Sequence, residues 1–333
     1  MTEMEAPPVR SVTLVAMLLA TPLAATADPL PSWNPGATET AIVDFVTRVT
    51  DPASDDFVPE EVRIAVFDND GTLWSEQPMY FQGIYVLQRL KEKAAADPSI
   101  LTSDAMKAAA AGDMQGVMAG GEKGLVEILN ASHAGMSVDD FKAGAREWLT
   151  TEKHPTSGLT YAEMTFQPML ELLSYLRDNG FKTYIVSGGG IDFMRSITRE
   201  AYGIPTWQVI GSEGSTKYEL GEDGGMTLVK EGGITFIDDN VGKPVGIESH
   251  IGQRPIFAAG NSDGDFQMLE WTTAGDGPRF GLLVHHTDAE REFAYDRDSS
   301  FGKLDEALDA APDRGWTVVD MKTDWSRIWS GEN

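Results

Sequence analysis

Short apolar runs alternate with longer amphipathic stretches along most of the chain. Apolar runs bounded by polar loops predict buried parallel strands. They stand at 63–67, 182–186, 208–211, 255–259 and 281–284. Helical spacing of apolar positions lies between them, at 39–49, 167–179, 191–202 and 266–270. This alternation of strand and helix predicts an α/β fold built on a doubly wound parallel sheet.

One long stretch departs from the alternation. From 79 to about 160 the pattern is helical, with no convincing strand. We therefore expect a core domain made of 28–78 and 161–333, with a helical domain at 79–160 inserted after the first strand. A hairpin is expected at 218–229, around the turn residues Glu222-Asp223-Gly224-Gly225.

The N-terminal segment has the layout of a secretory signal. Arg10 precedes the apolar run SVTLVAMLLATPLAATA, which ends in the small residues Ala25-Thr26-Ala27. We expect residues 1–27 to be a cleaved signal peptide, the alternative being a buried N-terminal helix. A bacterial periplasmic or secreted location would follow. With no lipobox cysteine, no membrane anchoring is expected after cleavage.

Composition narrows the classes of partner. The 333 residues include 26 Lys+Arg and 52 Asp+Glu, so the formal net charge is −26. Such acidity argues against nucleic acid and against an anionic membrane surface, since both need clustered cations. The absence of cysteine removes disulfides, thiol nucleophiles and cysteine-ligated metals.

Three polar loops follow three of the predicted strands. They are Asp68-Asn69-Asp70-Gly71-Thr72, Ser187-Gly188-Gly189-Gly190 and Gly260-Asn261-Ser262-Asp263-Gly264-Asp265. In a doubly wound sheet the carboxyl ends of the strands share one edge, where ligands bind. We expect the three loops to meet there.

These loops can support phosphoryl transfer. Asp68 and Asp70, with Asp263 or Asp265, make an all-oxygen site suited to Mg²⁺. Ser187 and the amides that follow it form an anion cradle at a helix N-terminus. A metal, a phosphate cradle and a spare carboxylate that can attack suggest a reaction through an aspartyl-phosphate.

The same residues resemble the haloacid dehalogenase (HAD) superfamily, and in particular its exported phosphoserine-phosphatase-like group. The first motif, DxDGT and an apolar residue, stands here as Asp68 to Leu73, and the second as Ser187. The third is best matched by Lys243, with Lys217 and Lys230 as rivals, and the fourth by residues 260–265. The resemblance implies a HAD-like, Rossmannoid, three-layer α/β/α core with a helical C1 cap.

The resemblance also implies roles for these residues. Asp68 would be the nucleophile, and Asp70 the acid that protonates the leaving group and then the base that activates water. Ser187 and Lys243 would hold the phosphoryl oxygens, supported by Thr72, Gly188 and Gly189. Mg²⁺ would be held by Asp68, Asp70 and the fourth motif, at Asn261, Asp263 or Asp265. Asn261 is a departure, since many members carry an aspartate ligand there.

Several neighbouring residues allow two interpretations. Trp74 and Glu76 lead from the first motif to the cap and are expected to shape the substrate pocket, although Trp74 also suits core packing. Of His285 and His286, at most one can face the sheet edge, because adjacent strand residues point to opposite faces. Four methionines are expected in the core of the cap, namely Met79, Met106, Met114 and Met118.

The sequence thus predicts an exported, Mg²⁺-dependent phosphomonoester hydrolase that acts on a small phosphorylated metabolite. A phosphotransferase using the same intermediate, or a non-catalytic periplasmic protein that binds phosphate esters, remains an alternative. A dehalogenase is disfavoured, because halide displacement needs neither Asp70 as an acid nor a metal. Since an anionic substrate must reach an acidic protein, we expect the mouth of the site to be neutral or positive.

Overall fold

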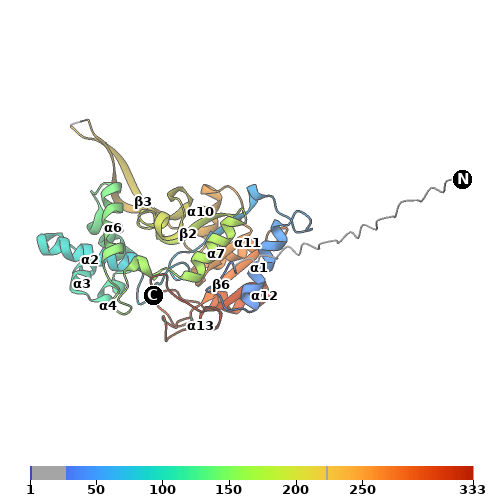
Figure 1. The fold of residues 1–333 in the computed structure, drawn as a ribbon. Helices are drawn as coiled ribbons and strands as arrows, with labels where there is room; N and C mark the ends of the chain where they lie inside the picture. The colour runs from blue at the N-terminus through green and yellow to red at the C-terminus, as the bar shows by residue number, and fades with distance from the viewer. Residues whose placement is uncertain (2–27, 223, 333) are drawn as a thin grey trace.

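The computed structural model describes residue 1, residues 28–222 and residues 224–332, and the signal peptide predicted at 1–27 lies almost wholly outside these ranges. A seven-stranded sheet in the order β4-β3-β2-β1-β5-β6-β7 forms its centre (Figure 1). All neighbours are parallel except β3 and β4. The strands are β1 (Ile64–Phe67), β2 (Lys182–Gly190), β3 (Val209–Leu220), β4 (Met226–Phe236), β5 (Phe257–Gly260), β6 (Phe280–His285) and β7 (Thr317–Asp320).

Helices cover both faces of this sheet, as the alternation of its side chains requires. Ala65 and Phe67 of β1 point into one apolar cluster, which includes α1 (Ala37–Thr50) and α7 (Gln167–Asp178). Ile64 and Val66 point into the other, against α10 (Gly242–His250), α11 (Phe266–Thr273) and α12 (Glu306–Arg314). The predicted three-layer α/β/α fold is confirmed.

Six α-helices are described between β1 and β2 in the sequence, and we call all of them except α7 the inserted helices. They gather at one end of the molecule, away from α1 and α12 (Figure 1). Aromatic contacts hold them together, including Tyr85 against Trp148 at 5.5 Å and Trp148 stacked on Tyr161 at 4.2 Å. They are α2 (Phe81–Ala96), α3 (Asp104–Ala111), α4 (Met114–Ala119), α5 (Gly121–His133) and α6 (Val138–Thr151).

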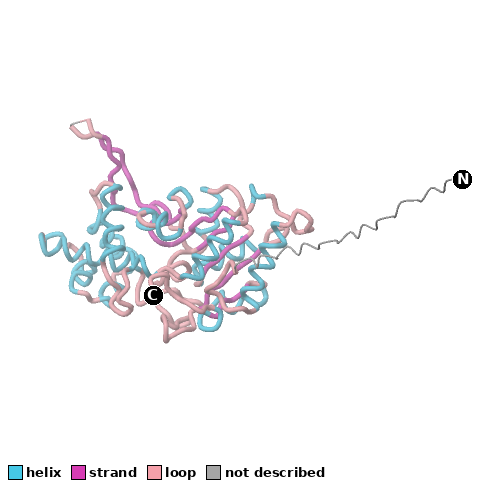
Figure 2. The backbone as a smooth tube through the Cα atoms, viewed as in Figure 1, coloured by secondary structure: helices cyan, strands magenta, loops and turns pink. Residues whose placement is uncertain are grey.

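The predicted hairpin is present and longer than expected. β3 starts parallel to β2 and then pairs antiparallel with β4, with Tyr218 opposite Leu228. Its outer part projects as an arm (Figure 2). Nearer the sheet, backbone hydrogen bonds join Lys230 to Gly135 and Met136, in the turn between α5 and α6. The hairpin therefore links the sheet to the inserted helices.

The segment after β2 differs from the expectation. The sequence predicts a loop at 187–190 and one helix at 191–202. Instead β2 continues through its glycines with a shift in register, pairing Gly190 with Ser212. The helix is divided into α8 (Ile191–Arg195) and α9 (Thr198–Tyr202), because Ile197 leaves the helical conformation with φ −136°. A short helix, α13 (Met321–Asp324), follows β7. Among the described residues, no helix is both long and apolar enough to cross a membrane.

Candidate active site

The loop after β1 sets two carboxylates into one cavity. Asp68 continues the strand, its amide donating to the carbonyl of Ala259 at 2.9 Å. The loop then turns through Gly71, whose φ of +76° favours glycine. A Cβ at Gly71 would also stand 2.1 Å from Nδ2 of Asn261, which leaves no room for a side chain. Asp68 and Asp70 both line the cavity that opens beside this loop.

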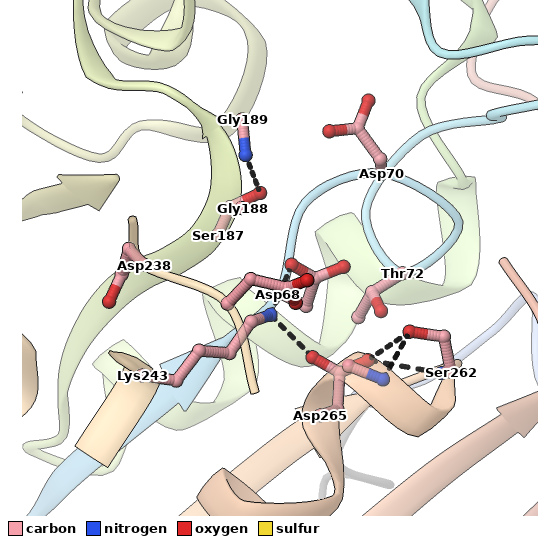
Figure 3. Close-up of polar contacts among 12 residues, drawn as sticks. Asp68, Asp70, Thr72, Ser187, Gly188, Gly189, Asp238, Lys243, Ser262 and Asp265 are labelled. Atoms are coloured by element: carbon pink, nitrogen blue, oxygen red, sulfur yellow. Dashed lines mark hydrogen bonds and ion pairs between the residues drawn. The ribbon is translucent and has the colours of Figure 1, made fainter. Parts of the chain in front are cut away.

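Lys243, at the start of α10, bridges two of the predicted acids. Its Nζ lies 2.6 Å from Oδ1 of Asp68 and 2.5 Å from Oδ1 of Asp265 (Figure 3). The other two lysines proposed for this role lie elsewhere: Lys217 pairs with Glu219 on the surface, and Lys230 pairs with Asp192. Lys243 is therefore the lysine that contacts the candidate nucleophile.

This contact holds charge in a buried place. Burial raises the pKa of Asp68, and repulsion from Asp265 raises it further, while Lys243 lowers it. Burial alone would lower the pKa of Lys243, but Asp265 and Asp68 outweigh that effect and raise it. The lysine is thus charged, and its single charge is shared between two carboxylates.

Asp70 faces the same cavity from the next turn of the loop. Its Oδ1 accepts a hydrogen bond of 2.8 Å from Nε1 of Trp74. Burial raises the pKa of Asp70 to about 6, an effect that the bond from Trp74 opposes. The glycines after Ser187 lie close by, because a Cβ built on Gly189 would stand 3.3 Å from Oδ2 of Asp70. A pKa close to neutral, in a carboxyl group beside the glycine loop that could bind an anion, suits Asp70 for general acid–base catalysis.

The end of β2 supplies the predicted cradle in modified form. Ser187, Gly188 and Gly189 all line the cavity. The hydroxyl of Ser187 accepts from the amide of Gly189 at 3.2 Å, and the amide of Gly190 donates to Gln82 of α2 at 2.7 Å. The loop is therefore held from both sides, by its own serine and by an inserted helix.

Asn261 lies at the centre of a buried polar network. Its Oδ1 accepts from the hydroxyl of Thr72 at 3.0 Å, and its Nδ2 donates to Oε1 of Glu76 at 2.7 Å. The same oxygen of Glu76 accepts from the hydroxyl of Tyr295 at 2.8 Å. Burial raises the pKa of Glu76 well above its ordinary value. The sequence did not indicate the contact between Glu76 and Asn261, since 185 positions separate them.

Three predicted site residues have other surroundings. Asp263 points away from the other acids, since its Oδ1 accepts from the amides of Asp305 and Ala307 at the start of α12. This bonding argues against its expected role as a metal ligand. Thr72 and Trp74 are buried and do not line the cavity, so neither shapes the substrate pocket directly.

The histidines and methionines are divided between core and cavity. His286 is buried, with Nε2 2.7 Å from the carbonyl of Gly71, and thereby supports the first-motif loop. His285 instead pairs with Asp296. Met106 lies in the apolar core as expected. Met114 packs against the same core and also lines the cavity. The expectation is wrong for Met79 and Met118, which line the cavity and are not among the core residues.

The donor atoms can be compared with the magnesium that the sequence predicts. Within the described ranges, no three His, Cys, Asp or Glu side chains form a ready-made metal cluster. Magnesium, however, often takes one or two carboxylates and keeps several waters. Asp68, Asp70, Glu76 and Asp265 are gathered here, and Lys243 is the one lysine or arginine found in contact with any of them in the described structure. This excess of buried negative charge fits a divalent cation.

The cavity itself has a volume of about 530 Å³ and lies between the sheet edge and the inserted helices. Its described lining includes two lysines, Lys230 and Lys243, against seven acids. These acids are Asp68, Asp70, Glu76, Asp192, Glu213, Glu231 and Asp239. The hairpin and the segment after it contribute Glu213, Glu231 and Asp239 to this lining, and the sequence did not indicate these carboxylates. That the mouth becomes neutral or positive with its metal bound stays a prediction.

Two of the neighbouring acids were missed by sequence reasoning. Asp238 and Asp239 follow β4, and Asp239 lines the cavity. Asp238 is fully buried, and within the described part of the chain no side chain donates a hydrogen bond to its carboxylate. Burial raises the pKa of Asp238 to about 7. The signal available was their position directly before the helix that carries Lys243.

Comparisons with known proteins extend this picture. The chain is similar in structure to a protein of unknown function from Bordetella pertussis Tohama I, with 17% identity over 78% of this chain and 98% of that one, and a TM-score of 0.49. It is also similar to a conserved protein of unknown function from Anaerococcus prevotii DSM 20548, with 14% identity, coverage of 75% and 86%, and a TM-score of 0.49.

A third similar structure is a probable phosphoserine phosphatase from Vibrio cholerae, with 16% identity over 67% of this chain and 55% of that one, and a TM-score of 0.36. A search of curated protein sequences finds no match. The family model of haloacid dehalogenase-like hydrolases matches residues 65–270, which span all three polar loops. The chain therefore belongs to the haloacid dehalogenase-like hydrolase family.

Proposed function

We propose that this protein is a Mg²⁺-dependent phosphomonoester hydrolase that acts through an aspartyl-phosphate formed on Asp68. The observation that carries the proposal is the contact of Lys243 with both Asp68 and Asp265, in a cavity that Asp70 also faces. A carboxylate held by a lysine at the base of a cavity is placed to attack, and a second carboxyl beside it is placed to move protons.

In this mechanism the chain's residues have distinct tasks. Asp68 attacks phosphorus, and the phosphoryl group passes to it as the alcohol leaves. Asp70, held by Trp74, gives its proton to the oxygen of the leaving group, which departs as the alcohol. It then takes a proton from the water that attacks the aspartyl-phosphate, which releases phosphate and restores Asp68. Ser187, its glycines and Lys243 hold the phosphoryl oxygens. Magnesium, when bound, would supply positive charge against the phosphate, and Asp68, the carbonyl of Asp70 and Asn261 would hold it.

The inserted helices and the N-terminal segment indicate where the reaction takes place. Residues 79–160 act as a cap, since the inserted helices form the far wall of the cavity. The substrate is a small phosphorylated molecule. The signal-like segment at 1–27 supports export to the bacterial periplasm or medium. Intact-mass measurement of protein recovered from the periplasm should show loss of residues 1–27.

The function is tested by turnover of p-nitrophenyl phosphate by the purified protein. We expect activity with Mg²⁺, its loss in EDTA, and a fall of at least about a thousandfold in Asp68→Asn. Asp263→Asn is the matched control, because it removes a nearby charge that points away from the cavity. Binding of phosphate esters by the wild-type protein without any turnover would contradict the proposal, as would full activity of Asp68→Asn.

A further inference from the structure

The cavity continues beyond the catalytic residues into an apolar lobe. From Asp68 and Ser187 it extends to the inserted helices and to β4. Large apolar side chains from four elements form this far wall. They are Val86 and Leu87 of α2, Met118 of α4, Leu125 and Leu129 of α5, and Ile234 of β4. We call this set the apolar lobe.

Part of this lobe is exposed to an unusual degree. Met118 is 56% exposed, Leu125 46% and Ile234 42%. Large apolar side chains left open to water by separate elements, and converging on one cavity, mark a binding surface. Three of the lining residues are methionines, Met79, Met114 and Met118, whose flexible side chains adapt to varied apolar shapes. The lobe therefore suits an apolar ligand group.

The polar groups around the lobe point to the same chemistry. Of the cations that line the described cavity, Lys230 is paired with Asp192 at 2.5 Å, and Lys243 is paired with Asp68 and Asp265. Glu213, Glu231 and Asp239 add negative charge to the wall. A ligand carboxylate or second phosphate would find no unpaired lysine or arginine among these described lining residues and would meet like charge.

We infer that the substrates of this site are phosphomonoesters of apolar alcohols, alkyl or aryl, with the organic group seated in the apolar lobe. This inference rests on the proposed phosphatase function and names its substrate class. Phosphorylated amino acids and bisphosphates are disfavoured, because their extra anionic groups lack partners in the lobe.

The first experiment compares kcat/KM for n-butyl, n-hexyl and n-octyl phosphate with that for O-phospho-L-serine, all with Mg²⁺. We expect kcat/KM to rise along the alkyl series by about fourfold per methylene until the lobe is filled. O-phospho-L-serine should be the poorest of the four. Equal or better turnover of O-phospho-L-serine than of n-octyl phosphate would overturn the inference.

Calorimetric titration with n-butyl-, n-hexyl- and n-octylphosphonate separates this inference from the proposed function, because phosphonates bind without being hydrolysed. Affinity that rises with chain length, in the absence of any turnover of the phosphates, would refute the phosphatase and support the lobe. Turnover of all four esters, together with phosphonate affinity that does not change with chain length, would support the phosphatase and overturn the lobe.

Two pairs of variants locate the effect. Leu125→Ser and Met118→Ser should each reduce the preference for n-octyl over n-butyl phosphate by about tenfold. Leu220→Ser and Met226→Ser are matched controls, since these residues are 65% and 72% exposed on the hairpin and lie outside the cavity. All four positions are solvent-accessible, so folding is preserved. An undiminished chain-length preference in both lobe variants would overturn the assignment.

Discussion

Nδ2 of Asn261 donates a hydrogen bond of 2.7 Å to Oε1 of Glu76, and both residues are buried beside Asp68 and Asp70. The resemblance to HAD proteins implies an aspartate at position 261. Here Asn261 carries a neutral amide, and Glu76, just after the first motif, supplies a carboxyl group in contact with it. The carboxyl group expected from the fourth motif thus stands at position 76, where burial raises its pKa.

The position of Glu76 beside Asn261 leads to a prediction about cation binding. Glu76→Gln should weaken Mn²⁺ or Mg²⁺ binding by about tenfold or more, because it removes a carboxyl group that a bound cation would favour in its ionised form. The double variant Glu76→Gln with Asn261→Asp should recover most of that affinity. Titration of the metal-stripped protein by calorimetry, with Mn²⁺ binding followed by EPR, measures both. Glu171→Gln is the control, because this carboxylate bonds Ser32 and does not line the cavity. Affinity unchanged in Glu76→Gln would contradict the prediction.

Trp74→Phe tests how Asp70 is held. The variant keeps an aromatic ring in the core but loses the hydrogen bond to Oδ1 of Asp70. Since that bond lowers the pKa of Asp70, its loss should raise this pKa and move the pH profile of kcat upward. We expect kcat to fall by about tenfold with little change in KM.

Trp33→Phe serves as the control for Trp74→Phe. Trp33 donates through Nε1 to the carbonyl of Pro168, in the core at α7, and does not line the cavity. Both variants therefore lose one hydrogen bond from a buried indole, but only Trp74→Phe loses one to a residue of the cavity. Equal effects of both substitutions on kcat would show that Trp74 acts only through stability.

Asp263→Ala should affect stability and not chemistry. The carboxylate accepts two amide hydrogen bonds at the start of α12, so its removal should lower the free energy of unfolding by about 1–2 kcal/mol. Metal affinity should stay within about twofold of wild type. Chemical denaturation and metal titration of the same variant measure these effects, and a tenfold loss of metal affinity would restore Asp263 as a ligand.

Asp238 predicts a pH dependence of stability. Burial raises its pKa from 3.8 to about 7, so between these values the folded protein holds a proton that the unfolded chain releases. Its contribution to the free energy of unfolding is therefore present below about pH 4 and is lost as pH rises to about 7. In Asp238→Asn the side chain does not ionise, so this dependence on pH is absent.

The free energy of unfolding of Asp238→Asn minus that of wild type should therefore be larger at pH 8 than at pH 5, by roughly 1–3 kcal/mol. Urea denaturation of both proteins at the two pH values measures the difference, in which the titration of all other groups largely cancels. A difference that is the same at pH 5 and pH 8 would show that Asp238 is already ionised in the folded state.

The sequence predicted the sheet and the meeting of the loops because both follow from short-range patterns. Apolar runs mark strands, and the carboxyl ends of parallel strands share an edge, so Asp68, Ser187 and Asp265 had to come close. The direction of Asp263 could not be predicted, since it depends on where α12 begins some forty positions later. The acidic and apolar walls of the cavity were equally hidden, because they arise where the hairpin meets the inserted helices.

The hairpin has a mechanical consequence. β4 is hydrogen-bonded through Lys230 to the turn between α5 and α6, and its chain then runs directly through Asp238 to the helix that carries Lys243. A movement of the inserted helices would act on β4 through these two hydrogen bonds. The inserted helices and the helix that carries Lys243 are therefore joined by one short stretch of chain, so a change in the position of the first is transmitted toward the lysine that contacts Asp68.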